Sequence, residues 1–412
     1  MMQFILNRES KARLLCFTKV NKIAVWTKVG RKTRVAITRR KMIQGVTGAG
    51  LLGGTACQTD SSSHEKQMDE ENVPIIKQTS KLPPGTQPWP TIDPFLFCVY
   101  HKDFYPKGNA ALGPAASLDG RRIGSDFAGK DGWRMYHGET IPGFPSHPHR
   151  GFETITVVRK GMIDHADSLG AAARYGDGDV QWLTAGAGIQ HSEMFPLLRS
   201  TEENPTEFFQ IWLNLPKARK FAKPHFSMMW ADDVPDIVLE REGRVQGNIQ
   251  VIAGELHGRK PPSPPPDSYG AQADSDLAIW SIQLRPGATL ELPGAKSGTL
   301  RALYYFQGSD LHLQGKKLSS HTRIDTDATK PLTFENGPSH ADFLILQGRP
   351  IQEPVVKHGP FVMNSTQEIQ EAILDYRATG FGGWPWPSND PVHGQKVERF
   401  ARYGDGRIIK PT

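Results

Sequence analysis

Short runs of alternating apolar and polar residues recur in two segments of the chain, 92–215 and 237–353. A period of two residues is the pattern of strands that bury one face. The first segment predicts strands at 95–100, 154–159, 180–183, 189–195 and 208–215, and the second predicts strands at 249–252, 279–284, 289–292, 302–306 and 341–346. The fold class is therefore all-β, and two segments of similar length indicate a duplicated barrel.

Glycine and proline support a turn-rich chain, since it holds 41 Gly and 32 Pro. The run 261–266, which is almost all proline, interrupts the second segment and predicts an exposed loop. We divide this part of the chain into an N-terminal domain at 91–215, a C-terminal domain at 216–355 and a C-terminal helix and tail at 356–412.

One amphipathic helix is expected in the tail. Ser365 is placed to cap its start, Glu368 to complete a capping box and Gly380 to end it. Apolar residues at helical spacing form one stripe, namely Ile369, Ala372, Ile373 and Tyr376. This stripe predicts that the helix docks on a barrel rather than taking part in chemistry.

The basic charge of the chain is concentrated at its N-terminus. Residues 1–41 hold twelve Lys or Arg and one acid, Glu9, so they contribute +11 to the formal net charge. The remaining residues contribute −5, which gives the total of +6. A mildly acidic body argues against a nucleic-acid partner. At most two cysteines, Cys57 and Cys98, would remain after removal of the N-terminal leader, so no disulfide framework is expected.

Residues 1–57 are interpreted as a leader. The pair Arg39-Arg40, a short Gly-rich stretch and small residues before Cys57 resemble a twin-arginine export signal. Cys57 also resembles a lipoprotein cleavage site, although Gly54 stands where leucine is usual. We expect export to the periplasm or membrane anchoring through lipidated Cys57; the alternatives are a cytoplasmic protein with a basic tail and a start site placed too far upstream. Residues 58–90 are polar and rich in proline, which predicts a linker.

Two pairs of polar residues point to a metal site in the first segment. His147 and His149 are two residues apart, and His191 and Glu193 repeat that spacing 44 residues later. Side chains at i and i+2 lie on the same face of a strand, so two paired strands could aim all four at one metal ion. Three imidazoles and one carboxylate suit Fe(II), Ni, Cu or Zn, with Mn or Co as alternatives. Four protein ligands leave open positions, which favours catalysis or small-ligand binding.

Other polar residues near these pairs are weaker candidates for a role in the metal site. Glu153 is at most a residue that supports the ligands, and an ordinary buried carboxylate is the alternative, because Gly151 could turn it away. Arg150 and Gln181 are candidates for the rim of the site. His165 and His101 are expected to be surface or turn residues.

The motifs at 147–154 and 178–194 resemble the pirin family of the cupin superfamily. The resemblance extends over about 90–410 and includes the segments 93–97, 359–364 and 385–393. It implies two tandem cupin barrels and one metal, usually iron, in the N-terminal barrel. It also implies that Glu193 rather than Glu153 is the carboxylate ligand, and that the C-terminal barrel binds no metal. Pirins are mostly cytoplasmic or nuclear monomers, so the leader is a departure.

Three functions follow as hypotheses. The first is a metal-dependent dioxygenase that opens a flavonol ring, as some pirins open quercetin, with dioxygen and a small molecule as substrates and Glu193 as proton acceptor. The second is an iron-dependent redox-sensing or protein-binding module without catalysis. The third is an oxygenase or hydrolase for another aromatic or enol substrate, since the fold does not name a substrate.

Overall fold

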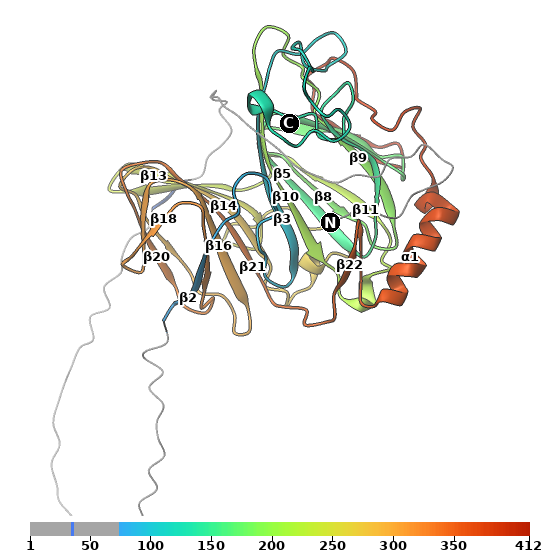
Figure 1. Cartoon of the computed structure of the whole chain (residues 1–412). Helices are drawn as coiled ribbons and strands as arrows, with labels where there is room; N and C mark the ends of the chain where they lie inside the picture. The colour runs from blue at the N-terminus through green and yellow to red at the C-terminus, as the bar shows by residue number, and fades with distance from the viewer. Residues whose placement is uncertain (1–33, 37–73) are drawn as a thin grey trace, which may run out of the picture.

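The computed structural model describes residues 34–36 and 74–412. In this part of the chain two β-barrels lie side by side, and one helix covers the outer side of the first barrel (Figure 1). The all-β prediction is confirmed, and each predicted strand coincides with an observed one, although those predicted at 189–195 and 208–215 extend one residue too far. Most of the predicted leader, including Arg39, Arg40 and Cys57, lies outside the described residues.

Two sheets face each other in the first barrel. The five-stranded sheet has the order β11 (His225–Met229), β8 (Val180–Thr184), β5 (Phe152–Lys160), β10 (Asn204–Asn214) and β3 (Phe95–Tyr105). The six-stranded sheet has the order β25 (Ile408–Ile409), β24 (Phe400–Arg402), β7 (Ala172–Gly176), β6 (Met162–Asp167), β9 (Ile189–Met194) and β4 (Gly143–His149). Their facing side chains, such as Val158, Phe208 and Ile163, form one buried core.

The second barrel repeats this arrangement. Its eight-stranded sheet has the order β1 (Arg34–Ala36), β12 (Asp236–Arg241), β13 (Arg244–Ala253), β14 (Ala278–Leu284), β21 (Ala341–Gly348), β16 (Leu300–Gln307), β19 (Thr322–Thr326) and β2 (Ile76–Lys81). The opposing sheet has the order β15 (Thr289–Leu292), β20 (Leu332–Asn336), β17 (Asp310–Leu313) and β18 (Lys316–Ser319). Residues from both sheets share a second core, which includes Ile249, Trp280 and Phe334.

A third core joins the barrels. The outer face of the five-stranded sheet packs on the eight-stranded sheet, so residues such as Ile155, Trp182 and Leu344 share one cluster. Trp89 stacks on Tyr304 with ring centroids 5.3 Å apart. Burial of an aliphatic or aromatic side chain contributes about 1.5–3 kcal/mol, so this interface binds the barrels into one body.

The prediction of a linker at 58–90 is wrong for its C-terminal part. Residues Ile76–Lys81 form β2, which pairs antiparallel with β19 at the edge of the second barrel. Leu82 and Trp89 are buried in the core between the barrels. The polar composition misled because an edge strand exposes one face and therefore carries polar side chains.

The predicted helix is confirmed as α1 (Thr366–Thr379). The Ser365 hydroxyl accepts a hydrogen bond from the Glu368 backbone N–H at 3.2 Å, and Gly380 ends the helix with φ of 56°. Ile369 and Ala372 pack on β23 (Phe361–Met363), which pairs with β22 (Val356–His358). The helix therefore docks on the first barrel, as expected. None of the described helices is long and apolar enough to cross a membrane.

Replacing Ser365 by Ala should loosen the first turn of α1. The lost cap is worth about 1 kcal/mol, so the first-turn amides should exchange with solvent about fivefold faster. Hydrogen–deuterium exchange measures this effect. Gln370→Ala, on the exposed side of the same helix, is the control, and equal protection in the two variants would contradict the capping role.

Candidate metal centre

Strands β4 and β9 bring the predicted histidines together. They pair antiparallel, and a bulge between Phe144 and His147 sets His147 opposite His191. His149 lies two residues further along β4 on the same face. One ligand nitrogen from each of these three histidines lies within 4.8 Å of the others. A metal ion needs donors that converge in this way, so the clustering predicted from the spacing is present for the three imidazoles.

The three imidazoles are buried, and hydrogen bonds to backbone carbonyls orient two of them. Nδ1 of His147 lies 2.9 Å from the Pro145 carbonyl oxygen, and Nδ1 of His149 lies 3.4 Å from that of Pro360. A carbonyl oxygen only accepts, so each Nδ1 carries the proton and each Nε2 keeps its lone pair. Nε2 of His149 and both ring nitrogens of His191 have no hydrogen-bond partner among the described residues. Buried nitrogens left in this state fit a metal ion.

The electrostatics of the cluster also favour metal binding. Burial lowers the pKa of His147 to about 4 and holds the pKa values of His149 and His191 well below their usual range. Proximity of the imidazoles to one another adds to the effect at His149 and His191. The rings are therefore neutral at physiological pH, and the neutral imidazole is the form that binds a metal.

Glu193 lies on the same strand as His191, but it is not one of the three converging groups. Its Oε1 accepts a hydrogen bond from Thr156 Oγ at 2.9 Å, and its Oε2 accepts one from Gln210 Nε2 at 2.6 Å. Both donors belong to the opposite sheet. Burial raises the pKa of the Glu193 carboxyl, which the hydrogen bonds partly offset. Its role as a ligand stays a prediction.

Glu153 faces away from the histidines. The turn between β4 and β5 contains Gly151, whose φ is 85°. This turn changes the face of the sheet to which the following side chains point. The Glu153 carboxylate accepts from Trp182 Nε1 and Thr184 Oγ1 on one oxygen. Its other oxygen accepts from Ser268 Oγ and the Tyr269 backbone N–H, which belong to the second half of the chain. Glu153 is thus a buried carboxylate that ties the two halves together, the alternative considered above.

The C-terminal segment closes one side of the centre. Arg150, next to His149, donates to Asp375 of α1 at 2.7 Å and to the Ala187 carbonyl at 2.6 Å. Its guanidinium carbon lies 4.4 Å from the centre of the Phe381 ring. Arg150 therefore anchors the helix beside His149, and its place at the rim of the site stays a prediction.

Two histidines were placed wrongly from the sequence. His165 is fully buried on β6, opposite Glu193, and its ring centre is 5.6 Å from that of His191. His101 is fully buried on β3 and stacks on Phe208 at 4.3 Å. Neither is a surface or turn residue, because both point into the first barrel. The strand β6 was missed since its sequence, Met162–Asp167, carries polar residues at buried positions.

Polar residues that the sequence did not single out also line the barrel interior. Thr156 and Gln210 donate hydrogen bonds to Glu193. Both could have been recognised in the sequence as polar residues within otherwise apolar strands. Gln181, a predicted rim residue, is fully buried opposite Thr156, and neither polar atom of its amide has a hydrogen-bond partner among the described residues. An amide in this state is suited to bind a polar group of a ligand.

A two-barrel cupin with a histidine cluster in its first barrel is the class of protein that this fold and site define. Residues 122–213 match the model of the Pirin family, and residues 279–382 match that of the Pirin C-terminal cupin domain. Human pirin is 32% identical over 241 residues, which cover 57% of this chain and 76% of its own length. The chain belongs to the pirin family.

Two further similarities bear on activity. A Pseudomonas aeruginosa protein that carries the name "Putative quercetin 2,3-dioxygenase" is 34% identical over 235 residues, which cover 57% of this chain and 77% of its own. The crystal structure of quercetin 2,3-dioxygenase from Acinetobacter baumannii superimposes with a TM-score of 0.57 at 27% identity, covering 75% of this chain and 96% of that one.

The metal content of variants should distinguish the role of Glu193 from that of Glu153. His191→Ala should reduce bound metal from about one ion per chain to nearly none, and Glu193→Gln should weaken metal affinity by about 10–100-fold, whether Glu193 is a ligand or supports the ligands. Glu153→Gln is the matched control and should bind metal as the wild type does. Elemental analysis after dialysis against a chelator measures all three. Equal metal loss in the Glu153 and Glu193 variants would contradict the assignment.

Stability should depend on pH through Glu153. Burial raises the pKa of this carboxyl from 4.5 to about 7, against the hydrogen bonds that lower it. The folded protein thus binds more protons than the unfolded chain between these values, and stability falls as the pH rises through this window, by about 1–3 kcal/mol. Denaturant unfolding of metal-free protein at pH 5 and pH 8 measures the change. The Glu153→Gln variant should lack this component of the pH dependence, and an identical dependence in both proteins would contradict it.

Proposed function

We propose that this protein is a metal-dependent dioxygenase that opens a flavonol or a related aromatic enol with dioxygen. The observation that carries the proposal is the set of three buried, neutral imidazoles that converge within one barrel beside a hydrogen-bonded carboxylate. The names of the related Pseudomonas and Acinetobacter proteins support the same chemistry.

His147, His149 and His191 would hold one divalent ion, with Glu193 as the fourth ligand. We propose Fe(II) as the metal, while Cu, Ni, Mn, Co and Zn are compatible with the same donors. When bound, the metal supplies a Lewis acid that stabilises an anionic oxygen of the substrate. The protein supplies a barrel interior that excludes bulk water around this ion.

Glu193 is suited to accept the proton of the flavonol 3-hydroxyl. Its raised pKa makes it a stronger base than an exposed carboxylate, and Thr156 and Gln210 keep it in place. Gln181 would bind another polar group of the substrate through its unpartnered amide. In the overall reaction both atoms of dioxygen enter the organic product and one ring carbon leaves as carbon monoxide.

Turnover of quercetin tests the proposal directly. Protein freed of metal and reloaded with one divalent ion at a time should release one carbon monoxide per flavonol consumed. The loss of flavonol absorbance measures the consumption. Glu193→Gln should lower kcat by about 10²–10⁴-fold, as the loss of a general base does. Glu153→Gln should keep the activity of the wild type. No turnover with any of the metals would contradict the flavonol substrate.

The place of action is a separate proposal. The Arg39-Arg40 pair and Cys57 support an exported protein, periplasmic or anchored to the membrane by a lipid on Cys57. A monomer is proposed from the pirin resemblance alone. Fractionation of cells that express the full chain tests it, because a wholly cytoplasmic protein would contradict export. Replacing Cys57 by Ser should release an anchored protein from the membrane without changing export.

A further inference from the structure

Gln190 lies on the outer face of the two strands that carry the histidine cluster. It directly precedes His191 on β9, and it lies opposite Pro148 of β4. Pro148 is the residue between His147 and His149. Because His191 points into the barrel, the side chain of its neighbour points to the other face of the sheet. Gln190 is buried there, with 8% of its surface exposed.

The Gln190 amide uses all of its hydrogen-bonding capacity on this outer face. Its Nε2 donates to the carbonyl oxygens of Gly380 at 2.6 Å and Gly383 at 3.1 Å. Its Oε1 accepts from the Tyr376 hydroxyl at 3.1 Å and, at 3.5 Å, from Ser146 Oγ. An amide offers two N–H donors and one oxygen with two lone pairs, so no capacity is left. One side chain thus joins β9 to β4, to the last turn of α1 and to the turn that follows it.

The segment 376–383 packs directly against the metal strands. A Cβ at Gly188, just before β9, would lie 2.6 Å from the Phe381 ring. Arg150, just after β4, donates from Nη1 to Asp375 at 2.7 Å, and its guanidinium carbon lies 4.4 Å from the centre of the Phe381 ring. The end of α1 and the turn after it therefore contact both strands from outside, each at a residue next to a histidine of the cluster.

His191 is the histidine whose orientation depends most on its backbone. Carbonyl oxygens orient the rings of His147 and His149 through Nδ1. Neither ring nitrogen of His191 has a hydrogen-bond partner in the described part of the chain. Histidines that bind metals usually have such a partner, which fixes the ring. The position of the β9 backbone must therefore place the His191 ring, and Gln190 attaches this backbone to the segment 376–383.

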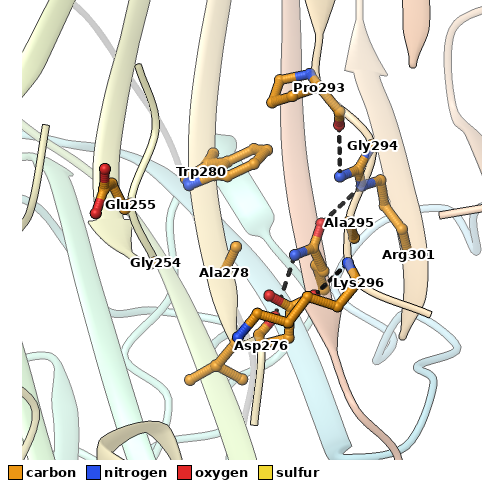
Figure 2. Close-up of a pocket in the computed structure, with 12 residues that line it drawn as sticks. Gly254, Glu255, Asp276, Ala278, Trp280, Pro293, Gly294, Ala295, Lys296 and Arg301 are labelled. Carbon is orange, nitrogen blue, oxygen red and sulfur yellow. Dashed lines mark hydrogen bonds between the residues drawn. The ribbon is translucent and has the colours of Figure 1, made fainter. Parts of the chain in front are cut away.

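A buried glutamine with its amide engaged is not by itself a sign of function. In the second barrel, Gln347 Oε1 accepts from Arg301 Nε at 2.8 Å, and its Nε2 donates to the Asp276 carbonyl at 3.1 Å. Figure 2 shows Arg301 and Asp276 beside the small cavity of that barrel. The described residues of the second barrel contain no histidine cluster that could hold a metal. Gln190 differs because it adjoins such a cluster and bonds to a segment outside its own sheet.

We propose that Gln190 is a positioning residue of the metal centre, which couples the docking of the segment 376–383 to the placement of His191. With the segment docked, the amide keeps β9 where the His191 ring faces the other two imidazoles. The coupling is reciprocal, so bound metal must stabilise the docked segment by the factor by which docking tightens metal binding. The proposal rests on the metal binding of the proposed function, but not on dioxygenase activity.

Gln190→Met tests the coupling from the strand. The substitution keeps the length of the side chain and removes its hydrogen bonds. It should weaken Co(II) affinity by about 10–100-fold, as the loss of residues that orient metal ligands does. Competition with a chelator measures the affinity in the full chain. The visible absorption bands of the Co(II)-saturated protein should also shift, because they report the placement of the ligands.

Gln250→Met is the matched control, since it makes the same change away from the histidines. The Gln250 Nε2 donates to the Gly178 carbonyl at 2.8 Å, and this bond also joins two separate segments. The variant should match the wild type in Co(II) affinity and in the absorption bands.

Tyr376→Phe tests the coupling from the helix. It removes one donor to the Gln190 amide, while the ring keeps its packing on Phe361 and Phe381. Co(II) affinity should fall by about 2–10-fold, as expected for one hydrogen bond, and the bands should shift in the same direction as in Gln190→Met. This variant decides the matter if Gln190→Met fails to fold.

Hydrogen–deuterium exchange measures the reverse direction of the coupling. In the wild type the backbone amides of 380–383 should exchange more slowly with Co(II) bound than without it. This difference should disappear in Gln190→Met and persist in Gln250→Met.

Three results would overturn the proposal. The first is a wild type that binds no Co(II), which would contradict the metal centre as well. The second is an unchanged Co(II) spectrum in the Gln190 and Tyr376 variants that fold, because an amide with a purely structural role would lower stability alone. The third is equal exchange of 380–383 with and without Co(II). Absence of carbon monoxide release from a wild type that shows the expected shifts would contradict only the dioxygenase, and the role of Gln190 would stand.

Discussion

The register between β4 and β9 is the constraint on which the rest of the site depends. His147 and His149 point to the centre only because they lie two residues apart on a strand whose partner presents His191 opposite His147. A slip of one residue would turn every side chain of one strand to the other face. Gly143 helps to fix the pairing, because a Cβ at this position would lie 2.5 Å from the Glu193 carbonyl oxygen. The bulge after Phe144 then brings His147 into line.

Once the register is fixed, burial gives the cluster its chemistry. The same desolvation that lowers the pKa values of the three histidines makes them neutral donors, and it raises the pKa of Glu193. The site also draws on the whole chain, since the Pro360 carbonyl orients His149 and Asp375 anchors Arg150. Glu153 joins the first barrel to Ser268 and Tyr269 on its other face. The orientation of the centre therefore depends on the C-terminal segment as well as on the first barrel.

Local pattern explains what the sequence predicted well. Alternation located the main strands, the i, i+2 spacing located the imidazoles, and capping residues located α1. The misplaced residues depend on contacts between distant segments. His165 lies on a strand whose buried positions are polar, and β2 is recognisable only once β19 is beside it. The orientation of Glu153 follows from the positive φ at Gly151; the glycine made this turn an expected alternative, but strand periodicity could not decide it.

The two barrels differ in the kind of buried polar group that they leave without a hydrogen-bond partner among the described residues. In the first barrel, ring nitrogens of His149 and His191 have no hydrogen-bond partner in the part of the chain that the structure describes, which suits a cation. In the second barrel the described residues leave Arg301 Nη1 and Trp280 Nε1 without an acceptor, which is the opposite polarity. The same sheet geometry thus holds polar groups of opposite character, because residue type rather than fold sets the chemistry of the inward positions of a barrel.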